Sequence, residues 1–475
     1  MKRITLITFL CSITISITAQ NFQFLSNLVY SVSINDAVEL NNKFYLVGSI
    51  DSSGTDKPYF CIIDSRGVMI FDSVYNSTGE FINVHEVDNI LYISHYFFNR
   101  LINFHMIFNL QYDTNFVFQD GIFVGEGVLQ KSKMNNDSTI LYIGYEPPLG
   151  PNHTYSSFVV KQDIITEHLT YNFQSYSINP LKSYDILSNP NGYYLFTNSP
   201  DSSVSNQVSI YNLDDSLNVV NSASITTSYK QFISNSPFLG PVTAVSLSDS
   251  TFMLNGHFKR PRYANQTNAN DIGLIVLDSS LSELNLDYAG KIDTNSFSGM
   301  NSIANLNGAF YLGNTENING KSEFMVSKAD STGNILWTKY YIKSNASIRL
   351  NKILPTSDQH LFLVGSYQLP TGVKQAFAIK TDTNLNSLPT LIKEIEMQLD
   401  FKVYPNPFKN ELTIVLPFSL KDAKYTIFTI DGRIIKHSKI FSKEQLLDVS
   451  SLSSGIYFIK FKIGDLAFNR KIIKL

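Results

Sequence analysis

A triplet of large apolar residues recurs seven times along the chain, and this repetition constrains the fold more than any other feature. Each triplet follows a cluster of turn residues such as Asn41-Asn42 or Asn307-Gly308, and another apolar stretch precedes that cluster. An apolar–turn–apolar pattern of this kind predicts an antiparallel hairpin. The triplets are Phe44-Tyr45-Leu46, Leu91-Tyr92-Ile93, Leu141-Tyr142-Ile143, Tyr193-Tyr194-Leu195, Phe252-Met253-Leu254, Phe310-Tyr311-Leu312 and Leu361-Phe362-Leu363.

An aspartate accompanies each triplet, at the point where the next apolar stretch ends and a short turn begins. The seven residues are Asp64, Asp113, Asp163, Asp214, Asp278, Asp330 and Asp382. A carboxylate at the first position of a turn accepts a hydrogen bond from the backbone N–H two residues further on. This turn role accounts for all seven together, so we assign them to turns rather than to catalysis or metal binding.

The two markers define a unit of strand, tight turn, strand, variable loop, strand, Asp turn and strand. Four antiparallel strands repeated seven times predict an all-β fold, a seven-bladed β-propeller over residues 20–389. Radial packing covers both faces of each sheet, which a lone sheet would leave exposed. Little chain remains after Asp382 to complete the last blade, so we expect residues 22–25 to supply its fourth strand and to fasten the ring.

The first residues have the pattern of an export signal. Lys2 and Arg3 precede an apolar run over residues 4–17, and Ala19 offers a small residue for cleavage. The run is shorter than the ~20 residues that span a bilayer, so we interpret residues 1–19 as a signal peptide rather than an anchor. No later segment has the length and apolarity of a transmembrane segment. Cleavage would leave Cys61 without a disulfide partner, and we expect it to be a buried apolar residue.

Charge is divided unevenly along the chain. The net charge is −3, yet basic residues outnumber acidic ones in residues 400–475, so the rest of the chain is acidic. An acidic body argues against nucleic acid as a partner. The change of character also indicates that residues 400–475 form a separate module.

Residues 400–475 have the pattern of a small Ig-like β-sandwich, with short alternating strands and frequent turns. Residues 404–407, Tyr-Pro-Asn-Pro, interrupt any regular element. Asp431-Gly432 predicts a tight hairpin turn, and Ser453-Ser454-Gly455 turns the chain into another apolar strand. Residues 390–399 are then a linker between the two modules.

This module resembles the type A C-terminal sorting domain of the type IX secretion system, also called the Por secretion system. The matching pieces occur in order and end at the C-terminus: Tyr404-Pro405-Asn406-Pro407, Asp431-Gly432-Arg433, Leu452-Ser453-Ser454-Gly455-Ile456-Tyr457 and Lys471-Ile472-Ile473-Lys474. The resemblance implies that the sorting signal includes Tyr404, Pro405, Asn406, Pro407, Gly432, Gly455, Tyr457, Lys471 and Lys474.

The resemblance also implies partners and a destination. The expected partners are the type IX secretion machinery and its sortase, which act on the C-terminal domain. The expected location is extracellular or at the outer-membrane surface, after Sec export and type IX secretion. Removal of the tail would require cleavage in the polar stretch between the modules, at about residues 384–398, where an exposed segment can be reached.

Three variable loops of the propeller combine aromatic and cationic side chains, which makes them candidates for ligand binding. Aromatic rings and guanidinium groups can stack on sugars or hold an anionic group. The alternative interpretation is that these rings pack on their own loops. The candidate residues are Tyr96, Phe97, Phe98, Arg100, Tyr145, Tyr155, Phe258, Arg260, Arg262 and Tyr263.

No recognised catalytic or metal-binding pattern stands out. His85, His95 and His105 lie ten residues apart, which does not match the spacing of metal ligands. Residues 315–326 match a calcium loop only in part, because the first position is Thr315 and the twelfth is Val326. We therefore predict no catalytic residue, no metal site and no cofactor.

The sequence favours a secreted or cell-surface propeller that binds or adheres without catalysis, with a polysaccharide or another surface ligand as its partner. An extracellular carbohydrate-active enzyme, a glycoside hydrolase or lyase on a propeller scaffold, is the alternative. A scaffold without a small ligand is the third possibility. Paired carboxylates about 5–10 Å apart in the mouth of the ring would favour the enzyme, and an aromatic platform without them would favour binding.

Overall fold

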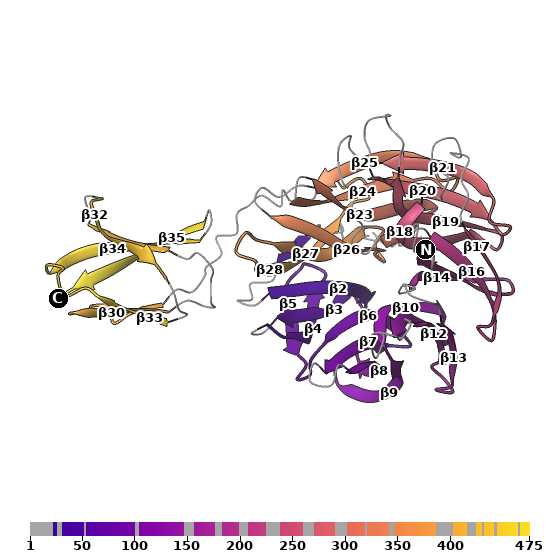
Figure 1. Cartoon of the computed structure of the whole chain (residues 1–475), viewed down its shortest axis with the longest axis horizontal. Helices are drawn as coiled ribbons and strands as arrows, with labels where there is room; N and C mark the ends of the chain where they lie inside the picture. The colour runs from indigo at the N-terminus through magenta and orange to yellow at the C-terminus, as the bar shows by residue number, and fades with distance from the viewer. Residues whose placement is uncertain are drawn as a thin grey trace, which may run out of the picture.

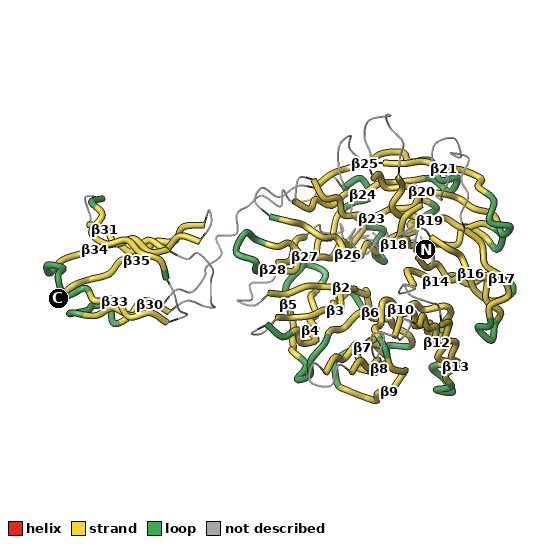
Figure 2. Tube along the Cα trace, in the orientation of Figure 1, coloured by secondary structure: helices red, strands yellow, loops and turns green. Residues whose placement is uncertain are grey.

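A computed structural model of the chain shows an all-β protein. The residues that it describes contain no helix, and therefore no helix that could cross a membrane (Figure 2). The described residues are 22–25, 31–51, 54–99, 104–146, 156–175, 183–198, 208–224, 238–259, 270–289, 302–318, 321–341, 346–385, 402–415, 424–429, 432–440, 444–463 and 466–475.

Four-stranded antiparallel sheets, here called blades and numbered in chain order, make up the part before residue 386 (Figure 1). Blade one contains β2 (Ser31–Leu40), β3 (Lys43–Asp51), β4 (Asp56–Asp64) and β5 (Met69–Val74). Blade two contains β6 (Glu80–Val87), β7 (Ile90–Asn99), β8 (Phe104–Asp113) and β9 (Phe118–Glu126). Blade three contains β10 (Val128–Asn136), β11 (Thr139–Glu146), β12 (Ser156–Asp163) and β13 (Leu169–Ser175).

The following blades repeat this order. Blade four contains β14 (Ser183–Asn189), β15 (Gly192–Asn198), β16 (Val208–Asp214) and β17 (Val219–Ser224). Blade five contains β18 (Phe238–Ser248), β19 (Thr251–Lys259), β20 (Asn270–Asp278) and β21 (Glu283–Ala289). Blade six contains β22 (Ser302–Leu306), β23 (Ala309–Ile318), β24 (Lys321–Ala329) and β25 (Ile335–Tyr341). Blade seven contains β26 (Ser347–Pro355), β27 (Leu361–Gln368), β28 (Lys374–Thr381) and β1 (Phe22–Leu25).

The blades are arranged around an axis, and the first strand of each chain repeat lies nearest to it (Figure 1). Each of these inner strands packs on the next one, and β2 packs on β26, so the described blades form a closed circle. Apolar clusters fill the seams between neighbouring blades; between blades seven and one, for example, Phe44 stacks on Phe362 with ring centroids 4.0 Å apart. Cys61 lies in the same cluster and is fully buried, as predicted. The predicted propeller-like, all-β fold is confirmed.

The Asp turns occur as the sequence predicts. In all seven, an oxygen of the aspartate carboxylate accepts a hydrogen bond from the backbone N–H two residues on, as at Arg66 (2.9 Å) and Ser216 (2.9 Å). The turns also place a residue in the left-handed region, and leucine occupies it at Leu217, Leu281 and Leu385. Leu217 and Leu385 are buried in the seam clusters, so apolar burial offsets the backbone strain.

Blade seven is completed by the N-terminal strand. β1 pairs antiparallel with β28, with Phe22 opposite Lys380 and Leu25 opposite Phe377. Blade seven thus combines the two ends of the ring-forming chain, and backbone hydrogen bonds fasten the circle. The predicted closing strand is confirmed.

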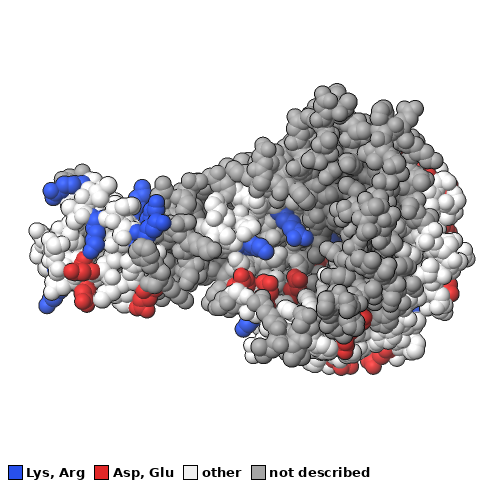
Figure 3. Space-filling view, in the orientation of Figure 1, with Lys and Arg blue, Asp and Glu red and all other residues white. Residues whose placement is uncertain are grey.

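The C-terminal module is a separate β-sandwich, and none of its described strands pairs with a strand of the blades. One sheet contains β29 (Lys402–Tyr404), β30 (Glu411–Val415) and β33 (Glu444–Asp448); the other contains β31 (Lys424–Thr429), β32 (Ile434–Lys439), β34 (Gly455–Ile463) and β35 (Leu466–Lys474). Leu412 and Ile414, two residues apart on β30, are both fully buried in its core. Lysine and arginine side chains are prominent on this module in Figure 3, in line with its basic composition.

Deletion of residues 20–25 tests the closing strand. We expect the free energy of unfolding to fall by about 2–4 kcal/mol, because the backbone of β28 loses its hydrogen-bonded partner. Urea unfolding followed by circular dichroism measures the change. Deletion of residues 402–475 is the control and should leave the unfolding midpoint of the ring in place. Equal stability of the chain with and without residues 20–25 would contradict closure by β1.

Candidate functional site

A β-bulge interrupts the inner strands at a corresponding point. The pairing with the second strand skips a residue between Ile34 and Asp36, and equivalent shifts lie before Asn83, Lys131, Asp185 and Lys352. A bulge bends its strand and redirects the neighbouring side chains. At these five bulges the inner strand therefore presents a polar residue toward the next blade, rather than only along the pleat.

Glycine on the second strand makes room for this bulge. A Cβ on Gly48, Gly144 or Gly365 would come within 2.2 Å of a backbone carbonyl oxygen of the bulged strand. No side chain fits at that distance, so these positions require glycine for close approach of two backbones. Each of these glycines lies opposite the residue before the bulge: Ile34, Leu129 and Leu350, respectively.

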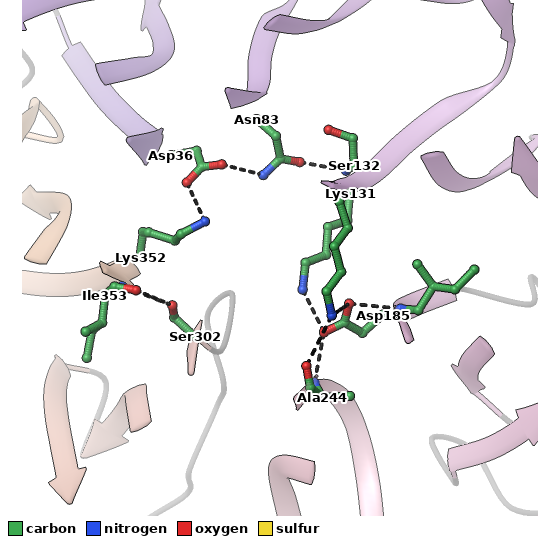
Figure 4. Close-up of polar contacts among 11 residues, drawn as sticks. Asp36, Asn83, Lys131, Ser132, Asp185, Ala244, Ser302, Lys352 and Ile353 are labelled. Atoms are coloured by element: carbon green, nitrogen blue, oxygen red, sulfur yellow. Dashed lines mark hydrogen bonds and ion pairs between the residues drawn. The ribbon is translucent and has the colours of Figure 1, made fainter. Parts of the chain in front are cut away.

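The residues after the bulges form a belt around the inner rim (Figure 4). We define the inner-rim belt as the corresponding positions of blades one to seven: Asp36, Asn83, Lys131, Asp185, Thr243, Ser302 and Lys352.

Four belt residues accept, through a side-chain oxygen, a hydrogen bond from the backbone of the next blade. Asn83 Oδ1 accepts from the N–H of Ser132 at 2.7 Å. Asp185 Oδ2 accepts from the N–H of Ala244 at 2.9 Å. Ser302 Oγ accepts from the N–H of Ile353 at 3.0 Å. Asp36 Oδ2 accepts from the N–H of Val84 at a longer distance of 3.4 Å. The belt therefore joins blades that share no sheet hydrogen bonds.

Lysine at a belt position cannot accept, and there the next blade supplies a carboxylate. Lys352 Nζ lies 2.8 Å from Asp36 Oδ1, across the seam between blades seven and one. Lys131 Nζ lies 2.8 Å from Asp185 Oδ2, across the seam between blades three and four. Both aspartates are almost completely buried, whereas the lysine side chains keep about a third of their surface or less exposed.

The ion pairs set the protonation of the belt. Burial alone would raise the pKa of Asp36 and Asp185, but the lysine charges and hydrogen bonds outweigh it and lower both pKa values. Burial lowers the pKa of His85 to about 4, against the opposing effect of Asp36. The two carboxylates are thus ionised and His85 is neutral near pH 7. Carboxylates held in this way are poor proton donors, which disfavours general acid catalysis at the belt.

The aromatic residues predicted to lie in the first loop belong to strand β7, near the end that leads to the variable loop. Tyr96 and Phe98 project from one face of β7 and both stack on His105 of β8, with ring centroids 5.8 and 4.5 Å away. Tyr96 Oη lies 2.6 Å from His105 Nδ1. Phe97 projects from the other face, at 6.4 Å from the ring of His95. The three rings pack on their own hairpin yet stay only half-buried, so both interpretations of the loop keep support.

Tyr145 and Glu80 adjoin this hairpin. Burial raises the pKa of Tyr96, with smaller effects of the same sign from Tyr145 and Glu80, so the three groups lie near one another. Glu80 lies opposite Tyr96 in the sheet, and its carboxylate accepts a hydrogen bond from Asn35 at 2.9 Å. Burial also raises the pKa of Glu80, and the neighbouring Asp56 adds to the effect. We refer to Tyr96, Phe98, His105, Tyr145 and Glu80 as the loop-face cluster.

The other predicted binding residues are not brought into this cluster by the described structure. Phe258 lies on β19, where its backbone pairs with Asp271. The remaining predicted residues lie outside the described part of the chain: Arg100, Tyr155, Arg260, Arg262 and Tyr263.

The histidines considered as metal ligands have separate surroundings. His85 Nε2 lies 2.9 Å from Ser132 Oγ, and His95 Nε2 lies 3.2 Å from Ser77 Oγ. His105 bonds to Tyr96. No group of three or more potential metal-ligating side chains occurs among the described residues. At the start of the partial calcium motif, Thr315 Oγ1 accepts a hydrogen bond from the backbone of Leu350.

In the C-terminal module, the predicted sorting residues hold the two ends of the sandwich together. Asn406 donates to the carbonyl of Lys471 and accepts from the N–H of Ile473, both at 2.9 Å. Lys474 is buried and its ammonium lies over the ring of Phe408 at 5.9 Å. Residues 405 and 407, both proline, flank Asn406, so this segment fixes the C-terminal strand.

The other sorting residues shape turns and the sheet surface. Tyr404 is 45% exposed and donates to Glu444 at 2.9 Å. Gly432 has a φ of 83° between β31 and β32, which favours glycine. Tyr457 Oη donates to the carbonyl of Ser453 at 2.8 Å, just before Gly455 opens β34.

The belt is the set that sequence reasoning missed. Asp36, Asn83, Asp185 and Ser302 each lie eight residues before a triplet, but the belt residues differ in type, so no common role could be recognised. A signal was nevertheless present: Gly48, Gly144 and Gly365 each come shortly after a triplet and mark the strand that accommodates the bulge.

Residues 402–475 match the model of the secretion system C-terminal sorting domain. The C-terminal module is therefore a type IX sorting domain, as predicted, and it implies export by the type IX secretion system to the cell surface or the extracellular space. It also implies interaction with the type IX secretion machinery.

Solved structures similar to the chain come from several organisms. The β-propeller domain of the Trilobed protease from Pyrococcus furiosus is 10% identical, with a TM-score of 0.44, over 77% of this chain and 98% of that one. Pyrococcus horikoshii acylaminoacyl peptidase is 11% identical, with a TM-score of 0.42, over 81% and 57%. The NanB sialidase of Streptococcus pneumoniae is 11% identical, with a TM-score of 0.36, over 76% and 68%. No curated protein sequence matches the chain.

Replacement of Asp185 by alanine tests the belt. We expect a loss of about 3–5 kcal/mol in the free energy of unfolding, because Lys131 loses its buried counter-ion and Ala244 loses its acceptor. Urea unfolding measures it. Asp214→Ala, which removes an exposed turn carboxylate, is the matched control and should cost much less. Equal effects of the two substitutions would show that the belt adds nothing to stability.

The buried histidines predict that acid weakens the ring. Burial lowers the pKa of both His85 and His95 to about 4, from the ordinary 6.5. The unfolded chain therefore binds protons first, so stability is complete above pH 6.5 and falls as the pH drops toward 4. For His95, which is 3% exposed, the shift corresponds to about 3 kcal/mol.

Melting temperatures between pH 7 and pH 4.5 measure this effect. His95→Phe should remove about half of the pH dependence, since His85 remains. His437→Phe, on the exposed surface of the sorting domain, should leave the slope unchanged. A slope that His95→Phe does not alter would refute the assignment.

Proposed function

We propose that this protein is a displayed binding or adhesion propeller, which the sorting domain delivers to the cell surface or the surroundings of the cell. In this proposal residues 1–19 are removed as a signal peptide after Sec export. Residues 20–389 are the working propeller, residues 390–399 a linker and residues 400–475 the sorting module. A sortase acting in the polar stretch at residues 384–398 would separate the two modules.

One contrast carries the proposal of binding rather than catalysis. The carboxylates nearest the ring axis, Asp36 and Asp185, are ion-paired and engaged in joining blades. The loop-face cluster instead presents half-buried aromatic rings on a rigid hairpin. Rings of this kind bind the apolar faces of sugars, so a polysaccharide or another surface polymer is the proposed ligand.

Glu80 favours the alternative, an extracellular carbohydrate-active enzyme. Burial raises its pKa, as a general acid requires, and Asp56 lies close enough to add to the effect. However, Glu80 is also fixed by Asn35, which ties its carboxylate to blade one. We therefore place this alternative second.

A glycan and polymer array with the full mature chain tests the proposal. We expect retention of a polymer, and Tyr96→Ala with Phe98→Ala should weaken it about tenfold, because two stacking rings are lost. The matched control is Phe118→Ala with Tyr171→Ala, which removes two exposed rings from the outer strands β9 and β13. Melting curves of both variants exclude unfolding as the cause.

The same array separates the alternatives. Polymer that is retained intact supports adhesion. Polymer that is shortened, with activity lost in Glu80→Gln, supports the enzyme. Retention that does not depend on the rings of Tyr96 and Phe98 would contradict the loop-face cluster as the binding surface.

A further inference from the structure

The inner-rim belt and the neighbouring Lys133 together carry more positive than negative charge. Three ammonium groups, those of Lys131, Lys133 and Lys352, face two carboxylates among the described residues there. His85, which lies among them, is neutral near pH 7. An excess cation in the centre of an otherwise acidic ring needs a physical reason, because like charges repel.

Lys133 is the cation that the belt does not require. It follows Lys131 by two residues on β10, so both side chains project from the same face. Lys131 already holds Asp185 at 2.8 Å, whereas Lys133 Nζ is 3.5 Å from the other oxygen of that carboxylate. The carbonyl of Ala244 accepts from Lys133 at 3.2 Å. An ammonium group has three N–H donors, so these two long contacts leave it capacity for a further acceptor.

The three ammonium groups affect one another. Burial lowers the pKa of Lys133 to about 8; Asp185 opposes the shift, and Lys131 and Lys352 reinforce it. Lys352 therefore acts on Lys133 from the far side of the ring, across blades seven and three. Figure 4 shows Lys352 and Lys131 reaching from opposite sides into the space that the inner strands enclose.

Solvent reaches all three side chains. Lys131, Lys133 and Lys352 are 26%, 29% and 35% exposed, although their aspartate partners are 0–1% exposed. A small solute can therefore approach the ammonium groups without displacing the carboxylates. A negative charge placed among them would offset their repulsion and accept the remaining N–H donors.

We propose that the inner rim is a binding site for a small oxyanion, a carboxylate or sulfate group, held by Lys133 together with Lys131 and Lys352. The oxyanion is either a free solute or the acidic group of a sugar. This site goes beyond the proposed adhesion at the loop face and does not depend on it, because the two surfaces share no residue.

Titration calorimetry and melting curves of the full chain test the site. The probes are sodium sulfate, sodium glucuronate and neutral glucose, at an ionic strength kept constant with sodium chloride. We expect sulfate or glucuronate to bind and to raise the melting temperature, since a ligand of the folded state stabilises it. Binding of both probes indicates a general oxyanion site, and binding of glucuronate alone indicates an acidic sugar. Glucose should have no effect.

Lys133→Met should weaken this binding at least about tenfold, the size of one charge-assisted hydrogen bond, while the chain still folds. Lys57→Met is the matched control: it removes the same charge from β4, the third strand of blade one, and should bind like the wild type. No binding of either anion to the wild type, or equal binding by the two variants, would overturn the proposal. Neither result would bear on the polymer array.

The pH dependence gives a second readout. Sulfate binding should fall as the pH rises through about 8, because Lys133 loses its proton there. The charged and titratable groups that face Lys133 or its neighbours are Asp36, His85, Lys131, Asp185 and Lys352. The lowered pKa values keep both aspartates ionised and His85 neutral over pH 7–9.5. A pH-independent affinity over this range would contradict the role of Lys133.

Discussion

The ring depends on a way to join blades that have no sheet hydrogen bonds between them. Apolar clusters in the seams supply most of the burial, but apolar contact has no direction and does not set the angle between neighbours. The bulge in the inner strand supplies direction, because it turns a polar side chain toward the backbone of the next blade. Repetition of this contact fixes each blade against the next, and glycine on the second strand makes it sterically possible.

Charge varies around the belt in a coordinated way. Where the belt residue changes from an acceptor to lysine, at Lys131 and Lys352, the next belt residue is an aspartate. A buried carboxylate without such a partner would destabilise the ring, so the two positions of each pair must change together. In blade five the belt position is Thr243, which carries no charge. Lys133 of blade three reaches across to blade five and donates a hydrogen bond to the carbonyl of Ala244.

Local patterns predicted the features that depend on local chemistry. The Asp turns and the closing strand could be read from the residues, because a carboxylate caps its own turn and the last repeat lacks a strand. The belt could not be read in this way. Its residues are Asp, Asn, Lys, Thr and Ser, which share a position but no common chemistry, and their printed partners lie on a neighbouring blade, far away in the sequence. The loop-face cluster was found only in part: Tyr96 and Phe98 were predicted, while Glu80 and His105 as their neighbours required the register of β6, β7 and β8.

The closing strand has a consequence for the order in which the protein is synthesised and folds. β1 is among the first segments of the mature chain to leave the ribosome, and its partner β28 is the last strand of the ring to do so. The sorting domain follows β28, so a chain that ends anywhere within the ring lacks both a complete circle of blades and the sorting domain. Because of this order, only a finished ring is followed by the domain that implies type IX export.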